Sequence, residues 1–104
     1  MRGRSLYRYE GRWCEHDLDE VASSHQALAF SFDVEDGDSI TVAATSADGH
    51  RYRGEYRYRE GSCSNGEVLF DRYRGPTGEV FAGEWLEAGG PRGPWIILLE
   101  AKSA

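Results

Sequence analysis

The 104-residue chain lacks several features that would assign it to a class at once. It contains no run of about 18 apolar residues, so we expect no membrane-spanning helix. Its two cysteines, Cys14 and Cys63, are too few for a disulfide scaffold. No apolar stretch follows the basic N-terminus, so we expect no signal peptide and a cytoplasmic protein. In that compartment we expect both cysteines to be free thiols. A single bridge between the two cysteines remains open.

An excess of positive charge is also lacking, because the formal net charge is −6. This argues against broad electrostatic binding to nucleic acid or to an anionic membrane, and we expect neither as a partner. The most basic segment carries Arg51, Arg53, Arg57 and Arg59 on one face of an expected strand. Residues 14–48 hold acids but no lysine or arginine, so we expect cross-strand pairing of the two charges. An anion or RNA site on the arginine face is the minor alternative.

Motifs of catalysis and metal binding are lacking as well. There is no Gly-x-Ser-x-Gly elbow, no phosphate-binding glycine loop and no His-Glu-x-x-His helix. Cys14 and His16 are two residues apart, and His25 and Cys63 could join them, but the chain has no closely spaced cysteine pair of the kind that holds structural zinc. We therefore expect no catalytic residues, no metal and no cofactor. An enzyme that uses one cysteine with a histidine is the third-ranked hypothesis.

Alternation of apolar and polar residues is the dominant pattern, and it predicts β-strands. The expected strands cover 4–13, 27–34, 39–46, 50–60, 67–74, 79–87 and 94–101. One segment differs, because Leu18, Val21 and Ala22 have helical spacing, and this predicts a short helix near 17–25. The prediction is a single all-β domain over 1–104. Its fold is an antiparallel meander barrel, or a barrel-like sandwich, of about seven strands with that one helix.

An aromatic-x-Gly-x-aromatic motif occurs three times along these strands. The three copies are Tyr9-Gly11-Trp13, Tyr52-Gly54-Tyr56 and Phe81-Gly83-Trp85. Alternation places the members of each copy on one face of a strand. A glycine between two rings permits the sharp bends that a sheet needs to curl into a barrel, so the motif has a structural explanation without any ligand.

Two segments resemble calycin-type barrels, the class that includes lipocalins and avidins. Gly11-Arg12-Trp13 resembles their Gly-x-Trp opening. The last third of the chain is similar to their closing hairpins, from Tyr73-Arg74-Gly75 through Phe81-Ala82-Gly83-Glu84-Trp85 to Trp95-Ile96-Ile97-Leu98. The resemblance implies an up-and-down barrel with a central pocket.

Tyrosine is unusually frequent for a core, with six Tyr against four Phe. Each buried hydroxyl needs a hydrogen-bond partner or costs about 1–3 kcal/mol. Either these hydroxyls reach water at the rims of the barrel, or they line a pocket for a small polar or planar ligand. The leading hypothesis is a non-enzymatic binding module, and its candidate ligand-binding residues are Tyr9, Trp13, Tyr52, Tyr56, Tyr58 and Trp85.

An outer apolar patch on the last two strands supports the alternative hypothesis, a protein-interaction or assembly domain. Alternation places five apolar residues on the face opposite to Phe81 and Trp85, namely Val80, Ala82, Leu86, Ile96 and Leu98. An exposed patch of this kind must be covered. Either the predicted helix near 17–25 covers it, or a second copy of the chain does so, and we expect the chain to form a homodimer.

Overall fold

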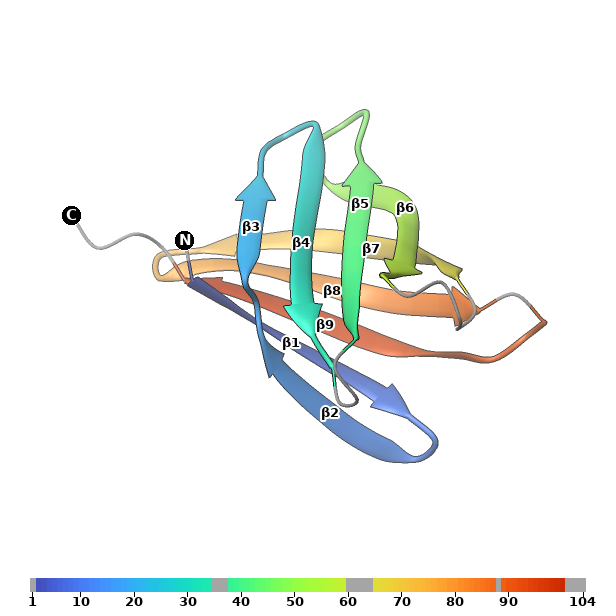
Figure 1. Ribbon diagram of the computed structural model, residues 1–104. Coiled ribbons are helices and arrows are strands. Elements are labelled where there is room, and N and C mark those ends of the chain that lie inside the picture. The colour runs from blue at the N-terminus through green and yellow to red at the C-terminus, as the bar shows by residue number, and fades with distance from the viewer. Residues whose placement is uncertain (1, 35–37, 60–64, 88, 101–104) are drawn as a thin grey trace.

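The computed structural model describes residues 2–34, 38–59, 65–87 and 89–100, and these residues form one antiparallel sheet of nine strands (Figure 1). The strands are β1 (Arg2–Tyr9), β2 (Arg12–Asp17), β3 (Glu20–Ser23), β4 (Ala27–Asp33), β5 (Ser39–Thr45), β6 (Arg51–Tyr58), β7 (Gly66–Gly75), β8 (Gly78–Glu87) and β9 (Arg92–Glu100). Their order across the sheet is β2-β1-β9-β8-β7-β6-β5-β4-β3. None of the described residues is helical, so no helix that could cross a membrane occurs among them.

The predicted antiparallel meander is confirmed, because each strand from β3 to β8 pairs with the next strand in sequence. Six of the predicted strands agree with β4 to β9 to within two residues, and positions 60 and 101 lie outside the described residues. The strand count is nine rather than seven. The two additional strands arise at the N-terminal end of the chain, where both local predictions need correction.

The expected strand over 4–13 is a hairpin rather than one strand. Glu10 and Gly11 have φ of 50° and 78°, which makes a two-residue turn between β1 and β2. The turn places Trp13 opposite Arg8 in the ladder, on the outer face, while Tyr9 lies opposite Arg12. Tyr9 and Trp13 therefore face opposite sides of the sheet, and the prediction that both rings point inward is wrong.

The predicted helix near 17–25 is a strand, β3, which pairs with β4. Val21 lies opposite Phe30 and is half-buried, whereas Ala22 lies opposite Ala29 and is exposed, as the period of two requires. Leu18 belongs to the bend before β3, so its spacing from Val21 has no helical meaning. The ladder with β4 satisfies the backbone of this segment, and this tertiary pairing overrides the local helical pattern.

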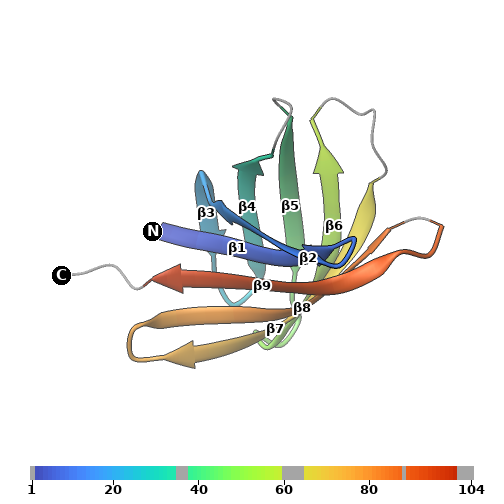
Figure 2. The ribbon, with the colours of Figure 1, turned by 90° about the horizontal axis from the view of Figure 1, so that it is seen from below.

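The sheet curls so strongly that its two halves form layers. In Figure 1, β3, β4, β5 and β6 stand upright and cross the strands β7, β8, β9, β1 and β2; Figure 2 shows the same crossing from below. The two end strands of the sheet, β2 and β3, are consecutive in the chain. At the bend between them, the Leu18 N–H donates to Gly3 O at 2.9 Å and the Asp19 N–H donates to Ser31 O at 2.8 Å. The bend therefore links β1 with β4 from opposite ends of the sheet.

The core lies between the layers and is rich in aromatic rings. Its buried residues are Leu28, Phe30, Phe32, Ile40, Val42, Ala44, Tyr52, Tyr56, Val68, Phe70, Phe81, Trp85, Trp95, Ile97 and Leu99. Trp95 is central: five other rings have their centroids 5.7–6.1 Å from its own. Its indole N–H donates to Ser5 Oγ at 2.7 Å, which satisfies a fully buried hydroxyl. Each large ring buried here contributes about 1.5–3 kcal/mol to folding.

The central glycines of two aromatic motifs lie where neighbouring backbones approach most closely. A Cβ added at Gly54 would lie 1.9 Å from the carbonyl oxygen of Ala43, and one at Gly83 would lie 1.7 Å from that of Leu69. No side chain fits at such separations. The predicted role of these glycines in curling the sheet agrees with this geometry.

Candidate functional site: an aromatic pocket at one end of the curled sheet

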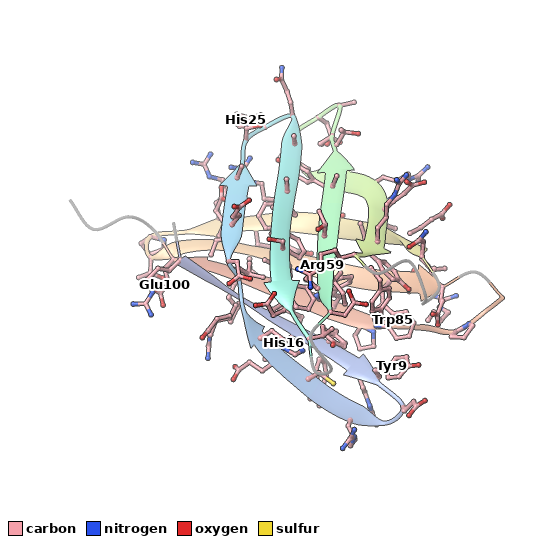
Figure 3. All side chains as sticks on the ribbon, in the orientation of Figure 1. Tyr9, His16, His25, Arg59, Trp85 and Glu100 are labelled. Atoms are coloured by element: carbon pink, nitrogen blue, oxygen red, sulfur yellow. The ribbon has the colours of Figure 1, made fainter. Side chains whose placement is uncertain are left out.

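A small cavity of about 30 Å³ lies at the end of the molecule where β6 and β8 finish and β5 and β9 begin. We call it the aromatic pocket. Its lining residues are Tyr7, Tyr9, Ile40, Tyr56, Tyr58, Trp85, Glu87 and Trp95. They come from five strands, so the pocket exists only because the sheet curls and gathers these strand ends. Figure 3 shows Tyr9 and Trp85 at this end and His25 at the other.

The rings of the pocket meet at steep angles rather than in parallel stacks. Tyr9 and Trp85 have centroids 5.8 Å apart with planes inclined by 42°. Tyr56 contacts Tyr58 at 6.2 Å and 74°, and Trp95 at 5.9 Å and 75°. The rings thus form walls around a space, and the two contacts of Tyr56 have the edge-to-face geometry that aromatic quadrupoles favour.

One carboxylate lies among these rings. Glu87 is two residues after Trp85 on the inward-facing row of β8, opposite Gly66. Burial raises the pKa of the Tyr56 phenol above its ordinary value, and the negative charge of Glu87 raises it further. The phenol is therefore protonated throughout the physiological range and offers a hydrogen-bond donor beside the carboxylate.

A wider groove of about 480 Å³ adjoins the pocket and shares Tyr7, Tyr9 and Tyr58 with it. The β1–β2 hairpin and Val34 form the rest of its wall. Within it, the Tyr7 hydroxyl lies 3.1 Å from His16 Nε2, and the His16 ring stacks on Phe32 with centroids 5.0 Å apart. The groove gives the pocket an approach from solvent that is lined by polar aromatic groups.

The opposite end of the interior is closed by a polar network. Arg72 projects inward from β7 with a side chain only 7% exposed, and its guanidinium pairs with Glu79. Ser23 Oγ also donates to Glu79 at 2.9 Å, and the Tyr52 hydroxyl donates to Ser24 O. Burial opposes the charged form of Glu79, but the hydrogen bonds from Arg72 and Ser23 and the nearby positive charges lower its pKa below the ordinary value.

The structure brings four of the six candidate ligand-binding residues together. Tyr9, Tyr56, Tyr58 and Trp85 all line the aromatic pocket. Tyr52 is fully buried at the closed end, and Trp13 is 55% exposed on the outer face.

Sequence reasoning missed Glu87 as a pocket residue. Its position on the same strand face as Trp85, two residues away, is the signal that would have found it. Trp95 and Ile40 also line the pocket, but only the order of the strands in the sheet reveals them.

The five residues of the predicted outer apolar patch share the outer face of β8 and β9. Val80 lies opposite Leu98, and Ala82 lies opposite Ile96, while Leu86 continues the row toward the end of β8. The neighbouring strands extend this surface with Leu6 on β1, opposite Ile96, and Tyr73 on β7, opposite Val80. Tyr73 is 59% exposed. The segment expected to cover this patch is β3, next to β4, so it is not the cover.

The remaining candidate groups do not assemble into a reactive or metal-binding centre within the described residues. Cys14 and His16 share a face of β2, but His25 lies at the other end of the molecule, beside Arg72. Cys63 lies outside the described residues. Over those residues, no three groups of the metal-ligating types come together.

Two arginines of the basic segment pair with acids, one of them across strands as predicted, but both acids lie outside residues 14–48. Arg51 Nε lies 3.1 Å from Asp71 on the adjacent strand, and Arg57 lies 3.3 Å from Glu55 on its own strand. These exposed ion pairs are worth about 0–1 kcal/mol each. The basic face is thus at least partly neutralised by its own surface.

Comparison with known proteins gives a fold and no function. No family model matches the chain, and no curated protein matches it. A solved structure described as a redesigned β-barrel is similar, with a TM-score of 0.62 and 14% identity, over 98% of this chain and 90% of the other. At that identity the likeness shows the fold alone. The barrel-type architecture predicted from the sequence is confirmed, with the sheet curled into a half-barrel.

Proposed function

We propose that this chain is a non-enzymatic binding module that holds a small molecule in the aromatic pocket. One observation carries the proposal: the inward-facing rings of β1, β6 and β8 surround a cavity at the end of the molecule that is not closed by the Arg72–Glu79 network. Pockets for small molecules are typically apolar and aromatic with a few placed polar groups. On this proposal, the chain resembles calycin-type barrels in using the interior of a curled meander sheet as its binding site.

The polar groups of the pocket support binding rather than covalent chemistry. The pocket offers tyrosine hydroxyls and one carboxylate, but its lining contains no cysteine, serine or histidine that could act as a nucleophile or as a base near neutral pH. Cys14 and His16 lie in the adjoining groove, where His16 is occupied by its contacts with Tyr7 and Phe32. The site is therefore suited to recognition of shape and hydrogen-bonding pattern.

A thermal-shift screen against a panel of small polar, planar and charged molecules tests the proposal. At about ten times its Kd, a ligand adds about 1.4 kcal/mol of stability, or roughly 5–10 °C in Tm for a domain of this size. The double variant Tyr56→Phe/Tyr58→Phe keeps both rings and removes both hydroxyls, so we expect a smaller shift. Tyr73→Phe removes a hydroxyl from the outer face and should respond as the wild type does. The proposal fails if no compound stabilises the wild type, or if the three proteins respond equally.

The outer apolar patch favours a second function, assembly of a homodimer. By register, Leu6, Ile96 and Ala82 form one row across three strands, and Leu98, Val80 and Tyr73 form the next. The expected intramolecular cover lies elsewhere in the fold. A twofold axis through this patch would pair it with its own copy, which is the commonest arrangement of soluble homo-oligomers.

The double variant Ile96→Glu/Leu98→Glu tests this second function. If a partner copy covers the patch, the variant should be a folded monomer, because two charges on each protomer would be buried against each other in the dimer. Analytical ultracentrifugation of wild type and variant measures the change in mass, and circular dichroism checks the fold. A monomeric wild type would contradict the dimer, and so would a variant that stays dimeric.

A further inference from the structure

The ring angles of the aromatic pocket bear on the shape of its ligand. A flat molecule is best held between two parallel rings, but the wall pairs described above are inclined by 42° and 74°. In the near-parallel pair of Tyr7 and His16, at 21°, only Tyr7 lines the pocket, because His16 lies in the groove. Walls inclined in this way suit a compact, rounded group that contacts several ring faces at once.

The charge of the pocket bears on the chemistry of its ligand. Glu87 is the one charged side chain in the pocket lining, and among the described residues no arginine, lysine or histidine forms an ion pair with it. Glu87 also lines an outer groove at this end, and the basic residue of that groove, Arg57, pairs with Glu55. Ring faces carry negative potential and attract cations, and a carboxylate beside them adds to that attraction.

The size of the pocket limits the ligand to a small group. A cavity of about 30 Å³ holds roughly two water molecules, so even a trimethylammonium group requires one wall to shift. Tyr9 is the wall placed to do so, because its ring is 43% exposed and lies at the end of β1 beside the turn. The remainder of such a ligand would extend into the groove, which begins at the same three tyrosines.

We propose that the aromatic pocket binds a small alkylammonium cation, with the ammonium group against the faces of Tyr9, Tyr56, Tyr58 and Trp85 and Glu87 as its counter-charge. This inference rests on the proposed function and narrows it to one class of ligand. Recognition of this kind requires neither a cofactor nor a proton transfer.

Isothermal titration calorimetry with three probes tests the inference. The probes are tetramethylammonium, choline, and 3,3-dimethylbutan-1-ol, which has the shape of choline without its charge. We expect both cations to bind, and the neutral alcohol to bind at least about tenfold more weakly, because cation–π attraction and the carboxylate act on charge alone. Equal affinity for choline and the alcohol would overturn the inference.

A matched pair of variants locates the effect at Glu87. Glu87→Gln should weaken choline binding about tenfold and leave the neutral alcohol unchanged. Glu67→Gln removes an exposed carboxylate from the outer face of the adjacent strand, and should change neither affinity by more than about twofold. Unchanged choline binding by Glu87→Gln would overturn the inference. Circular dichroism of each variant confirms that the comparison is made on folded protein.

Two further outcomes separate this inference from the function on which it rests. Suppose that a neutral or anionic compound of the thermal-shift panel stabilises the wild type more than Tyr56→Phe/Tyr58→Phe, and that no cation binds. The proposed binding function is then supported and the cation inference is overturned. If no compound of any charge binds, both are overturned. A last experiment asks whether the protein sediments together with phosphatidylcholine vesicles. If the wild type does so and Glu87→Gln does not, the bound cation is a lipid headgroup. If the wild type binds choline but does not sediment with the vesicles, the ligand is a free small molecule.

Discussion

At the scale of single residues, the glycines between aromatic rings determine whether the sheet can curl. Gly54 and Gly83 lie where a neighbouring carbonyl oxygen occupies the space of a side chain. Each is followed two residues later on the same strand face by a ring of the aromatic pocket, Tyr56 and Trp85. The close approach therefore positions the pocket rings as well as bending the strands.

Gly83→Ala should destabilise the protein by about 3 kcal/mol or more. Its Cβ would lie 1.7 Å from Leu69 O, and only movement of backbone in a packed sheet relieves that overlap. Gly75→Ala is the matched control, because the nearest atom to its Cβ is 3.9 Å away, and it should be neutral or slightly stabilising. Urea unfolding followed by tryptophan fluorescence measures both. A small effect of Gly83→Ala would contradict the assigned role of the glycine.

The face of the sheet on which a side chain lies could be predicted from sequence where no turn interrupts the alternation along a strand. Tyr52, Tyr56 and Phe81 are buried as alternation predicts, because no turn interrupts their strands. Trp13 could not be placed correctly, because the Glu10-Gly11 turn reverses the chain between it and Tyr9. Glutamate is an unusual residue at φ of 50°, so the pair lacks the Asn-Gly or Asp-Gly signal of a two-residue hairpin.

At the scale of elements, the inward charge on β7 closes one end of the interior and leaves the other to the aromatic pocket. Arg72 and Glu79 are 7% and 15% exposed, so their ion pair is largely shielded from water. A buried pair adds little net stability, but removal of one partner leaves an uncompensated charge that costs about 3–5 kcal/mol. The network therefore specifies which end of the molecule is closed.

Glu79→Gln should destabilise the protein by about 3 kcal/mol at pH 7. Its free energy of unfolding should also fall less steeply than that of the wild type as the pH is lowered. The folded-state pKa of Glu79 is lowered, so its contribution is fully present above the ordinary value of 4.5 and is lost as the pH falls through the lower folded pKa. Urea unfolding at pH values from 7 to 3 should show a steeper loss for the wild type than for the variant. Glu84→Gln, whose pair with Arg92 is more exposed, should change stability by less than about 1 kcal/mol.

Some acid sensitivity should remain in Glu79→Gln. The backbone N–H groups of Arg51 and His50 and the hydroxyl of Ser46 lower the pKa of Asp48 to about 2. Its contribution is present above its ordinary value of 3.8 and is lost as the pH falls toward 2. Equal acid profiles for wild type and Glu79→Gln would contradict the assignment of the larger effect to Glu79.

Elements could be predicted from sequence where a strand is long enough to show its period. Strands β4 to β9 have at least seven residues and were placed to within two residues of their ends. Strand β3 has four residues, which offer only two inward positions, so a period of two cannot be told from one of 3.6. Leu18 gave this segment its apparent helical spacing, but it lies in the bend before β3, where the backbone hydrogen-bonds to other strands.

At the scale of the whole molecule, the curled sheet has three distinct surfaces with different chemistry. One end presents the aromatic pocket, the other end is closed by the Arg72–Glu79 network, and the outer face of β8 and β9 carries the apolar patch. The sequence predicted an inner aromatic face and an outer apolar one. It could not show which strand ends meet, because the pairing of β1 with β9 joins segments about 90 residues apart.

The central claim is that the inward rings at this end form a pocket that a small molecule enters. The most direct measurement is an NMR titration with ¹⁵N-labelled tryptophan and the tightest ligand from the screen. The indole N–H of Trp85 donates to Arg8 O beside the pocket, and Tyr73 lies on the outer face of β7. The account predicts that the Trp85 signal shifts and that the ligand shows NOEs to the rings of Tyr56 and Tyr58 but none to the ring of Tyr73. A bound ligand that leaves the Trp85 signal in place and shows NOEs to Tyr73 but to neither Tyr56 nor Tyr58 would contradict it.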